Sequence, residues 1–122
     1  MTTEELKKRT FDFGIRIVRV VEYLPKGDIA RALGQQLLRA GTSVSANYRA
    51  AARARSRADF IAKMGIVEEE CDEALFWMEF LVALKLVKRS RLANLLNEGD
   101  ELLAIVVSSI TTARRRRNLV RR

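Results

Sequence analysis

The chain contains almost nothing that would interrupt a helix. Pro25 is the only proline among 122 residues, and it lies in the segment Leu24-Pro25-Lys26-Gly27-Asp28, which is typical of a turn. Before and after this segment, apolar residues recur at intervals of three and four, the spacing that places them on one face of an α-helix. The sequence therefore predicts an all-α protein.

Candidate capping residues divide the chain into four helices. Asp28 is expected to cap the second helix, Ser56 the third as part of a capping box with Asp59, and Ser90 the fourth. The expected helices span about residues 4–24, 28–54, 57–87 and 91–113. Because the connecting loops are short, neighbouring helices must run antiparallel. We therefore expect one domain, residues 1–113, folded as an antiparallel up-down-up-down four-helix bundle and followed by a basic tail, residues 114–122.

Positive charge is concentrated in two segments of the chain. The formal net charge is +8, from 23 basic and 15 acidic residues, and six of the basic residues are arginines of the tail. Guanidinium groups pair bidentately with phosphate and stack on bases, so clusters of arginine are candidates for nucleic-acid contact. The predicted nucleic-acid-binding residues are Arg49, Arg53, Arg55, Arg57, Arg114, Arg115, Arg116, Arg117, Arg121 and Arg122.

Two of the expected helices carry more apolar residues than one buried face requires. In the first helix a second apolar group lies roughly opposite the core face, and in the third helix a further group lies off the core face. An exposed apolar patch of this kind favours self-association, and a closed ring of subunits would cover it. The predicted oligomer interface consists of Phe11, Ile15, Val18, Ile66, Trp77, Phe80 and Leu84.

The sequence carries no pattern of a catalytic or metal-binding site. It contains no histidine and only one cysteine, Cys71, which excludes histidine-based acid–base catalysis, Cys/His zinc sites and an intrachain disulfide. Cys71 is expected in the core, and Gly41 and Gly65 are expected where helices approach closely. Asn47 lies on the apolar stripe of its helix, where a buried amide fixes helix register or bonds to neighbouring backbone. We expect a structural role for Asn47, no metal, no cofactor and no enzymatic activity.

One acidic cluster leaves alternatives open. Glu68, Glu69, Glu70, Asp72 and Glu73 are formally compatible with an all-carboxylate Mg²⁺ or Ca²⁺ site, which is the only enzymatic interpretation that the sequence allows. A solvated acidic face, or a partner for the arginines of another subunit, is the favoured interpretation.

The sequence also bears on where the protein is found. Its first residues are acidic and lack the layout of a signal peptide, and no apolar run is long enough to cross a bilayer. We therefore expect a cytoplasmic protein, in a bacterial-type cytosol, without a membrane partner.

A group of motif residues in the second and third helices resembles a known family. Arg39-Ala40 is followed by Ser43 and Asn47, and Asp59-Phe60 is followed by Glu73 and Trp77. In this combination, and over about residues 11–113, the chain resembles the four-helix-bundle family named for proteins encoded in intervening sequences of 23S ribosomal RNA genes. The resemblance implies assembly as a ring-shaped homopentamer. It also implies kinship in fold with the basic accessory proteins of diversity-generating retroelements, which contact nucleic acid and a reverse transcriptase, and it transfers no catalytic site.

Two functional hypotheses follow from the residues and the resemblance together. The first is a non-enzymatic, oligomeric nucleic-acid-binding protein that contacts RNA more readily than DNA through its arginines. The alternative is a protein–protein scaffold, or an accessory subunit for a reverse transcriptase or another nucleic-acid enzyme, without direct nucleic-acid contact.

Overall fold

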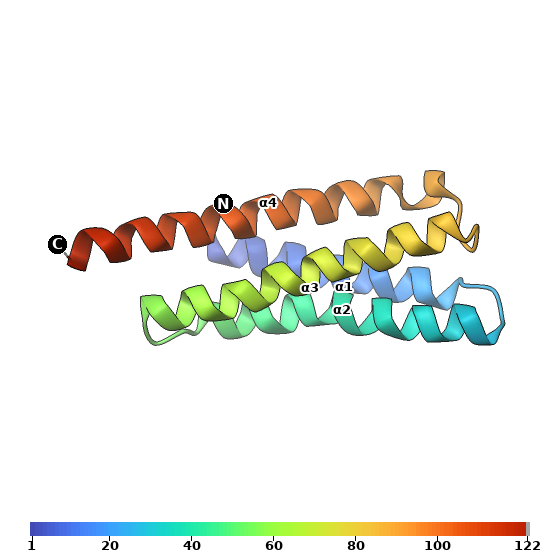
Figure 1. Ribbon diagram of the computed structural model, residues 1–122, viewed down its shortest axis with the longest axis horizontal. Helices are drawn as coiled ribbons and strands as arrows, with labels where there is room; N and C mark the ends of the chain where they lie inside the picture. The colour runs from blue at the N-terminus through green and yellow to red at the C-terminus, as the bar shows by residue number, and fades with distance from the viewer. Residues whose placement is uncertain (122) are drawn as a thin grey trace.

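The computed structural model consists of four α-helices joined by short turns (Figure 1). It describes the backbone of residues 1–121 and the side chains of residues 1–116. The helices are α1 (Thr3–Glu22), α2 (Asp28–Ala52), α3 (Arg57–Ala83) and α4 (Arg89–Arg121). No strand occurs in the described backbone. The predicted all-α four-helix bundle is confirmed.

The turns lie at alternate ends of an elongated molecule. The α1–α2 and α3–α4 turns share one end, and the α2–α3 turn lies at the other, where α4 extends beyond the other helices (Figure 1). The predicted end of the fourth helix at residue 113 is wrong, because the described helix continues to Arg121. Arginine is a good helix former, so nothing in the basic segment stops the helix. Arg122 lies outside the described residues.

The end of α3 and the capping residue of α2 also differ from the predictions, whereas α2 begins at the predicted residue 28. α3 ends at Ala83 instead of residue 87, because Lys85 adopts a left-handed conformation with φ 61°. The N–H of Leu86 then donates to the carbonyl of Leu81 at 3.0 Å, a bond that closes a helix end. At the start of α2 the capping residue is Gly27, with φ 142°, and Asp28 belongs to the first turn. The Ser56 cap of α3 is confirmed, since its hydroxyl accepts from the N–H of Asp59 at 3.0 Å.

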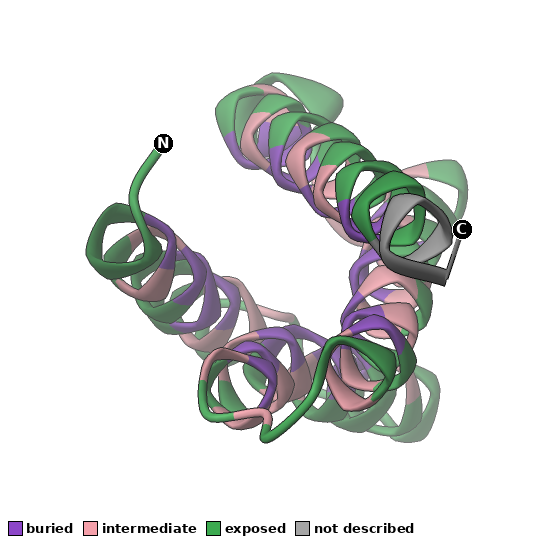
Figure 2. Cartoon of the chain, turned by 90° about the vertical axis from the view of Figure 1, so that its left-hand side faces the viewer, coloured by how far each residue is buried: buried purple, intermediate pink, exposed green. Residues whose placement is uncertain are grey.

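The core runs along the inner faces of the four helices (Figure 2). Phe13 and Ile17 of α1, Leu37 of α2, Met64 of α3 and Leu102 of α4 are among its fully buried side chains. Burial of such side chains contributes roughly 1.5–3 kcal/mol each relative to exposure, so the inward stripe is what holds the helices together.

Glycine permits close approach of helices at two places. A Cβ on Gly41 would lie 2.7 Å from side-chain atoms of Ile17, and one on Gly99 would lie 2.6 Å from Leu75. The expectation for Gly41 is therefore confirmed. The expectation for Gly65 is wrong within the described part of the chain, because a Cβ there would meet no atom within 4 Å.

α1 and α4 meet less closely than the helices that follow one another in the chain (Figure 2). The Arg9 guanidinium spans this seam, donating to Glu98 at 2.5 and 3.0 Å and to Glu101 at 3.0 Å. The hydrogen bond from Arg9 is the main reason that the pKa of Glu98 lies below its ordinary value. This charged bridge therefore joins α1 to α4 in addition to the apolar core that both helices share.

Within the described residues, none of the four helices has a stretch that is both long and apolar enough to cross a membrane.

Candidate nucleic-acid interface

Two basic segments that are far apart in the sequence meet at one end of the bundle. Arg57 begins α3 next to the α2–α3 turn, and Arg116 lies in the part of α4 that passes that turn (Figure 1). The two side chains line the same groove. The described members of the predicted set are all exposed: Arg49, Arg53, Arg55, Arg57, Arg114, Arg115 and Arg116. The side chains of the other three, Arg117, Arg121 and Arg122, lie outside the described residues.

The Arg57–Arg116 groove lies between the start of α3 and the second half of α4, with Met1 beside it. Its volume is about 810 Å³. Phe60 and Ile105 give it half-buried apolar walls. Ser108, Ser109 and Thr112 add hydroxyl groups along α4. The groove thus combines guanidinium groups, which suit phosphate, with a surface against which a flat ring can pack.

Among the described side chains, the arginines at this end form no ion pair with a carboxylate. Among residues 1–116, every ion pair within 4.0 Å uses a cation other than these arginines. The nearby carboxylate of Asp59 is bound by Lys63 at 2.9 Å, and this hydrogen bond is the main cause of its lowered pKa. The positive charge at this end therefore remains available to an external anion.

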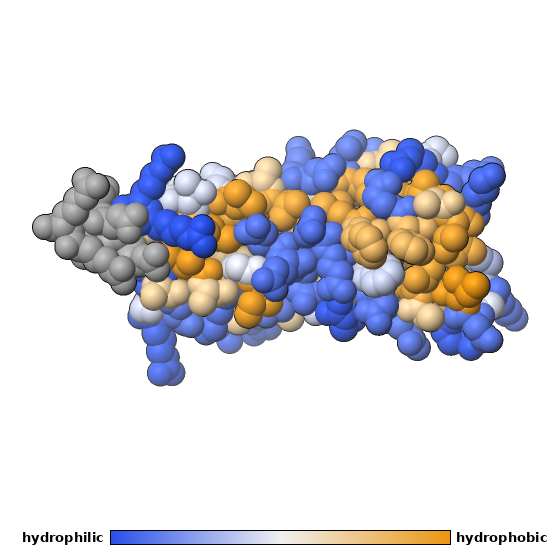
Figure 3. Space-filling view, in the orientation of Figure 1, coloured by the Kyte–Doolittle hydropathy of each residue, from blue (hydrophilic) through white to orange (hydrophobic). Residues whose placement is uncertain are grey.

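The second half of α3 exposes an aromatic surface, which we call the α3 apolar face. It consists of Phe76, Trp77, Phe80 and Leu84, and in Figure 3 apolar side chains gather over this part of α3. Phe76 is 52% and Phe80 42% exposed, and the Phe76 ring packs edge-on against Trp77 with centroids 4.9 Å apart. Trp77 itself is only half-buried. Sequence reasoning missed Phe76, although it lies one helical turn from Phe80.

The other predicted interface residues divide between two places. Phe11 and Ile15 are exposed and Val18 is half-buried, and all three line a hollow between α1 and α2 with a volume of about 380 Å³. We call this surface the α1–α2 hollow. Ile66 is exposed on α3, closer to its start than the aromatic residues.

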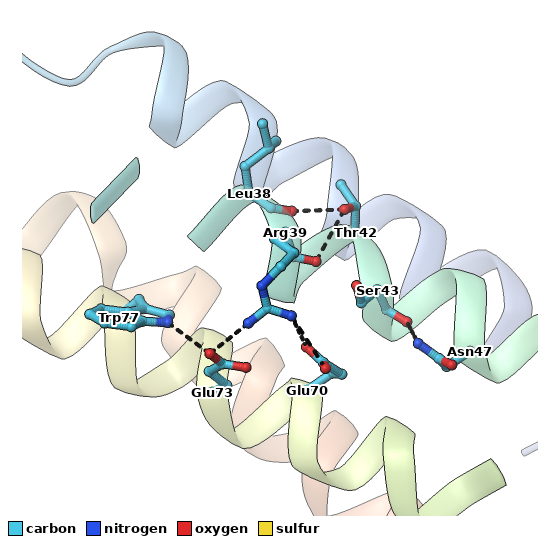
Figure 4. Close-up of polar contacts among 8 residues, drawn as sticks. All are labelled: Leu38, Arg39, Thr42, Ser43, Asn47, Glu70, Glu73 and Trp77. Carbon is cyan, nitrogen blue, oxygen red and sulfur yellow. Dashed lines mark hydrogen bonds and ion pairs between the residues drawn. The ribbon is translucent and has the colours of Figure 1, made fainter. Parts of the chain in front are cut away.

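Three of the family motif residues, Arg39, Glu73 and Trp77, are joined by hydrogen bonds across the seam between α2 and α3 (Figure 4). Arg39 of α2 forms ion pairs with Glu70 at 3.0 Å and with Glu73 at 2.6 Å, both on α3. The Trp77 indole N–H donates to Glu73 at 3.3 Å. The hydrogen bond from Arg39 is the largest cause of the lowered pKa of Glu73, with a smaller contribution from Trp77.

These contacts show what two carboxylates of the acidic cluster on α3 bind within this chain. Two of its carboxylates, Glu70 and Glu73, have Arg39 of the same chain as their partner, so an arginine of another subunit is not required there. Within the described residues, no three carboxylate, thiol or imidazole groups are placed to hold a metal ion.

Asn47 lies on the same seam and not in the core. The core stripe of α2 passes through Val44 and Tyr48, while Asn47 is half-buried. Its amide donates to the carbonyl of Ser43 at 2.8 Å, one turn earlier in the same helix. The expected place on the buried stripe is therefore wrong, because the stripe turns past this position, and the amide bonds to backbone of its own helix. The structural role of Asn47 stays a prediction.

The sequence of the chain matches a known protein family. The model of the 23S rRNA-intervening sequence protein family matches residues 3–108. The chain belongs to this family. A crystal structure of a protein of unknown function from the S23 ribosomal protein family, from Bacteroides thetaiotaomicron, is 32% identical, with a TM-score of 0.84 over 91% of this chain and 99% of that one. No curated protein matches the chain.

In this member of the 23S rRNA-intervening sequence protein family, the lone cysteine is structural. Cys71 is buried, its Sγ lies 3.5 Å from the carbonyl oxygen of Gly99, and burial raises its thiol pKa to about 12. A thiol with so high a pKa is a poor nucleophile at neutral pH. The sequence-based expectation of a core cysteine is confirmed.

Proposed function

We propose that this chain is a non-enzymatic nucleic-acid-binding protein that holds RNA phosphates at its arginine-rich end. The observation that carries the proposal is the groove lined by both Arg57 and Arg116, which come from the two basic segments of the sequence. Arginines on phosphates fix the position of a strand without reading its bases, so binding is expected to tolerate many sequences.

The shape of the groove favours a single strand over a duplex. Phe60 and Ile105 provide an apolar wall next to the two guanidinium groups, and an unstacked base needs such a surface. The family description refers to 23S ribosomal RNA, which supports RNA as the first target to test.

Self-association would strengthen this contact. We propose that the antiparallel up-down-up-down bundle forms a ring-shaped homopentamer in which the α3 apolar face of one copy packs against the α1–α2 hollow of the next. Because these two surfaces differ, the contact is head-to-tail, and such contacts generate rings when the rotation closes. Five copies of a chain with charge +8 carry +40, and several weak arginine contacts then act on one strand.

A salt titration tests the nucleic-acid proposal. Binding of a fluorescent single-stranded RNA is measured at increasing salt for the native protein and for Arg57→Ala/Arg116→Ala. Each phosphate contact on a single strand contributes about −0.7 to the slope of log K against log salt, so the double variant should lower the slope magnitude by about 1.4 per protomer.

Lys26→Ala/Arg31→Ala is the matched control, because it removes the same charge at the opposite end of the bundle. Both control residues are exposed, and neither lines the Arg57–Arg116 groove. Absence of binding at low salt, or an equal change of slope in the control, contradicts the proposal.

The α3 apolar face favours a second candidate function. A protein partner covers exposed aromatic rings better than RNA does, so this chain is also a candidate accessory subunit for a reverse transcriptase or a similar enzyme. Affinity capture from a nuclease-treated lysate distinguishes the two functions. The accessory role is supported when a protein is still captured after nuclease treatment and is no longer captured by the Phe76→Ser/Phe80→Ser variant.

A further inference from the structure

A second basic groove lies at the end of the bundle opposite to Arg57 and Arg116. We call it the Tyr23 groove; it is formed by the end of α1, the α3–α4 turn and the start of α4, and its volume is about 640 Å³. Its charged lining consists of Arg19, Lys85, Lys88 and Arg91. No carboxylate belongs to its lining among the described residues.

Three of the four cations lack an ion pair in the part of the chain whose side chains are described. Arg19 is bound to Glu22 at 2.9 Å. Lys85, Lys88 and Arg91 have no carboxylate within 4.0 Å among residues 1–116. Three positive charges around one cavity repel one another, and an anion from outside the chain would relieve this repulsion.

These cations also occupy positions that folding alone would give to other residue types. Lys85 has φ 61°, a conformation that favours glycine at the end of a helix. Lys88 directly precedes α4 and Arg91 lies in its first turn, which contains no acidic residue, although the helix dipole favours acids there. Residues that depart from the local preference for their position concentrate at functional sites. The basic residues at these positions therefore point to a role for the charge of the groove.

The groove has an aromatic residue at its edge and apolar side chains beneath it. Tyr23 is 84% exposed, the highest value among the large apolar and aromatic side chains described. Val20 and Leu86 are half-buried and form part of the lining. A ring beside several cations is the combination with which proteins bind single strands, because a base stacks on the ring while the cations hold the phosphates.

We propose that the Tyr23 groove is a second binding site for single-stranded nucleic acid. Lys85, Lys88 and Arg91 contact phosphate oxygens, and a base stacks on Tyr23. The ligand class rests on the proposed function, but the residues are different ones at the opposite end of the bundle. One protomer then holds two segments of a strand, one at each end.

Binding of a short fluorescein-labelled oligouridine, followed by fluorescence anisotropy, tests this site. Tyr23→Ala should weaken binding about ten-fold, because stacking on one aromatic side chain is lost, whereas Tyr23→Phe should bind like the native protein. Lys88→Ala/Arg91→Ala should reduce the magnitude of the salt slope by about 1.4. Lys26→Ala/Arg31→Ala lies at the same end, removes the same charge outside the groove, and should leave the slope unchanged.

Repeating the measurement in the Arg57→Ala/Arg116→Ala background separates the two sites. Loss of the remaining affinity on adding Tyr23→Ala supports the Tyr23 groove, even when the arginine-end variant alone has no effect and the first proposal fails. The inference is overturned when Tyr23→Ala binds like the native protein and Lys88→Ala/Arg91→Ala behaves like its control. All substituted side chains are exposed, and circular dichroism verifies that each variant is folded.

Discussion

Individual arginines join helices at three places in this molecule. Arg39 links α2 to α3, Arg9 links α1 to α4, and Arg89 reaches from the start of α4 to Glu79 of α3 at 2.6 Å. Pairs as exposed as those of Arg39 and Arg89 contribute little to stability, because water screens them. Their geometry instead fixes which residues of adjacent helices face each other. Arg57 and Arg116 at one basic groove and Arg91 at the other are of a different kind, since they form no ion pair among residues 1–116.

At the scale of one residue, Cys71 gives a prediction about reactivity. Burial, followed by the charges of Asp72 and Asp100, raises its thiol pKa to about 12. The native thiol should therefore stay unreactive towards a disulfide reagent at pH 8, and it should react rapidly once denaturant unfolds the chain. The absorbance of the released thiolate measures both rates. Rapid reaction of the folded protein would show that the thiol is accessible.

The elements show how far sequence reasoning reaches. The four helices follow from the spacing of apolar residues, and the Ser56 cap follows from its capping box. The pairing of Arg39 with Glu70 and Glu73 was not foreseen, although the two carboxylates are spaced to lie on one face of α3, because it also depends on the register between two helices. The end of α3 was missed because a lysine there takes a left-handed conformation that usually marks glycine.

Two glycines provide a matched test of helix packing. Gly41→Ala places a methyl group 2.7 Å from Ile17, so it should destabilise the fold by about 1–3 kcal/mol through overpacking. Gly65→Ala meets open space within a helix and should stabilise it by roughly 0.5–1 kcal/mol. Urea unfolding at one protein concentration measures both changes. A destabilised Gly65→Ala would indicate that a neighbouring molecule packs closely on this position.

At the scale of the whole molecule, the order of the turns brings the basic segments together. The segment between α2 and α3 and the second half of α4 share one end because alternate turns do (Figure 1). This placement follows from the expected topology, so the candidate interface was within reach of the sequence. The Tyr23 groove was not predicted. Lys85, Lys88 and Arg91 lie close together in the sequence, but their placement beside Tyr23 and Arg19 depends on how the end of α1 packs against the α3–α4 turn.

Assembly gives a prediction at the same scale. If the α3 apolar face is the subunit interface, the native protein should have a mass near 70 kDa by light scattering, five times 13.9 kDa, and Phe76→Ser/Phe80→Ser should give single chains. Val107→Ser is the control, because Val107 is as exposed as Phe80 but lies on α4. A native protein that is already monomeric, or a control that dissociates equally, would refute this interface.

The Arg9 bridge has a consequence for how the molecule comes apart. α1 and α4 have no connecting turn, they approach each other less closely than the connected helices, and the ion pairs of Arg9 join them. The pKa of Glu98 is lowered chiefly by its hydrogen bond to Arg9, so acid that protonates Glu98 removes this ion pair, and we expect this seam to open before those of the three directly connected helix pairs. In the first opened form, α1 and α4 would then have separated from each other, which exposes the buried side chains of Phe13 and Leu102 to water.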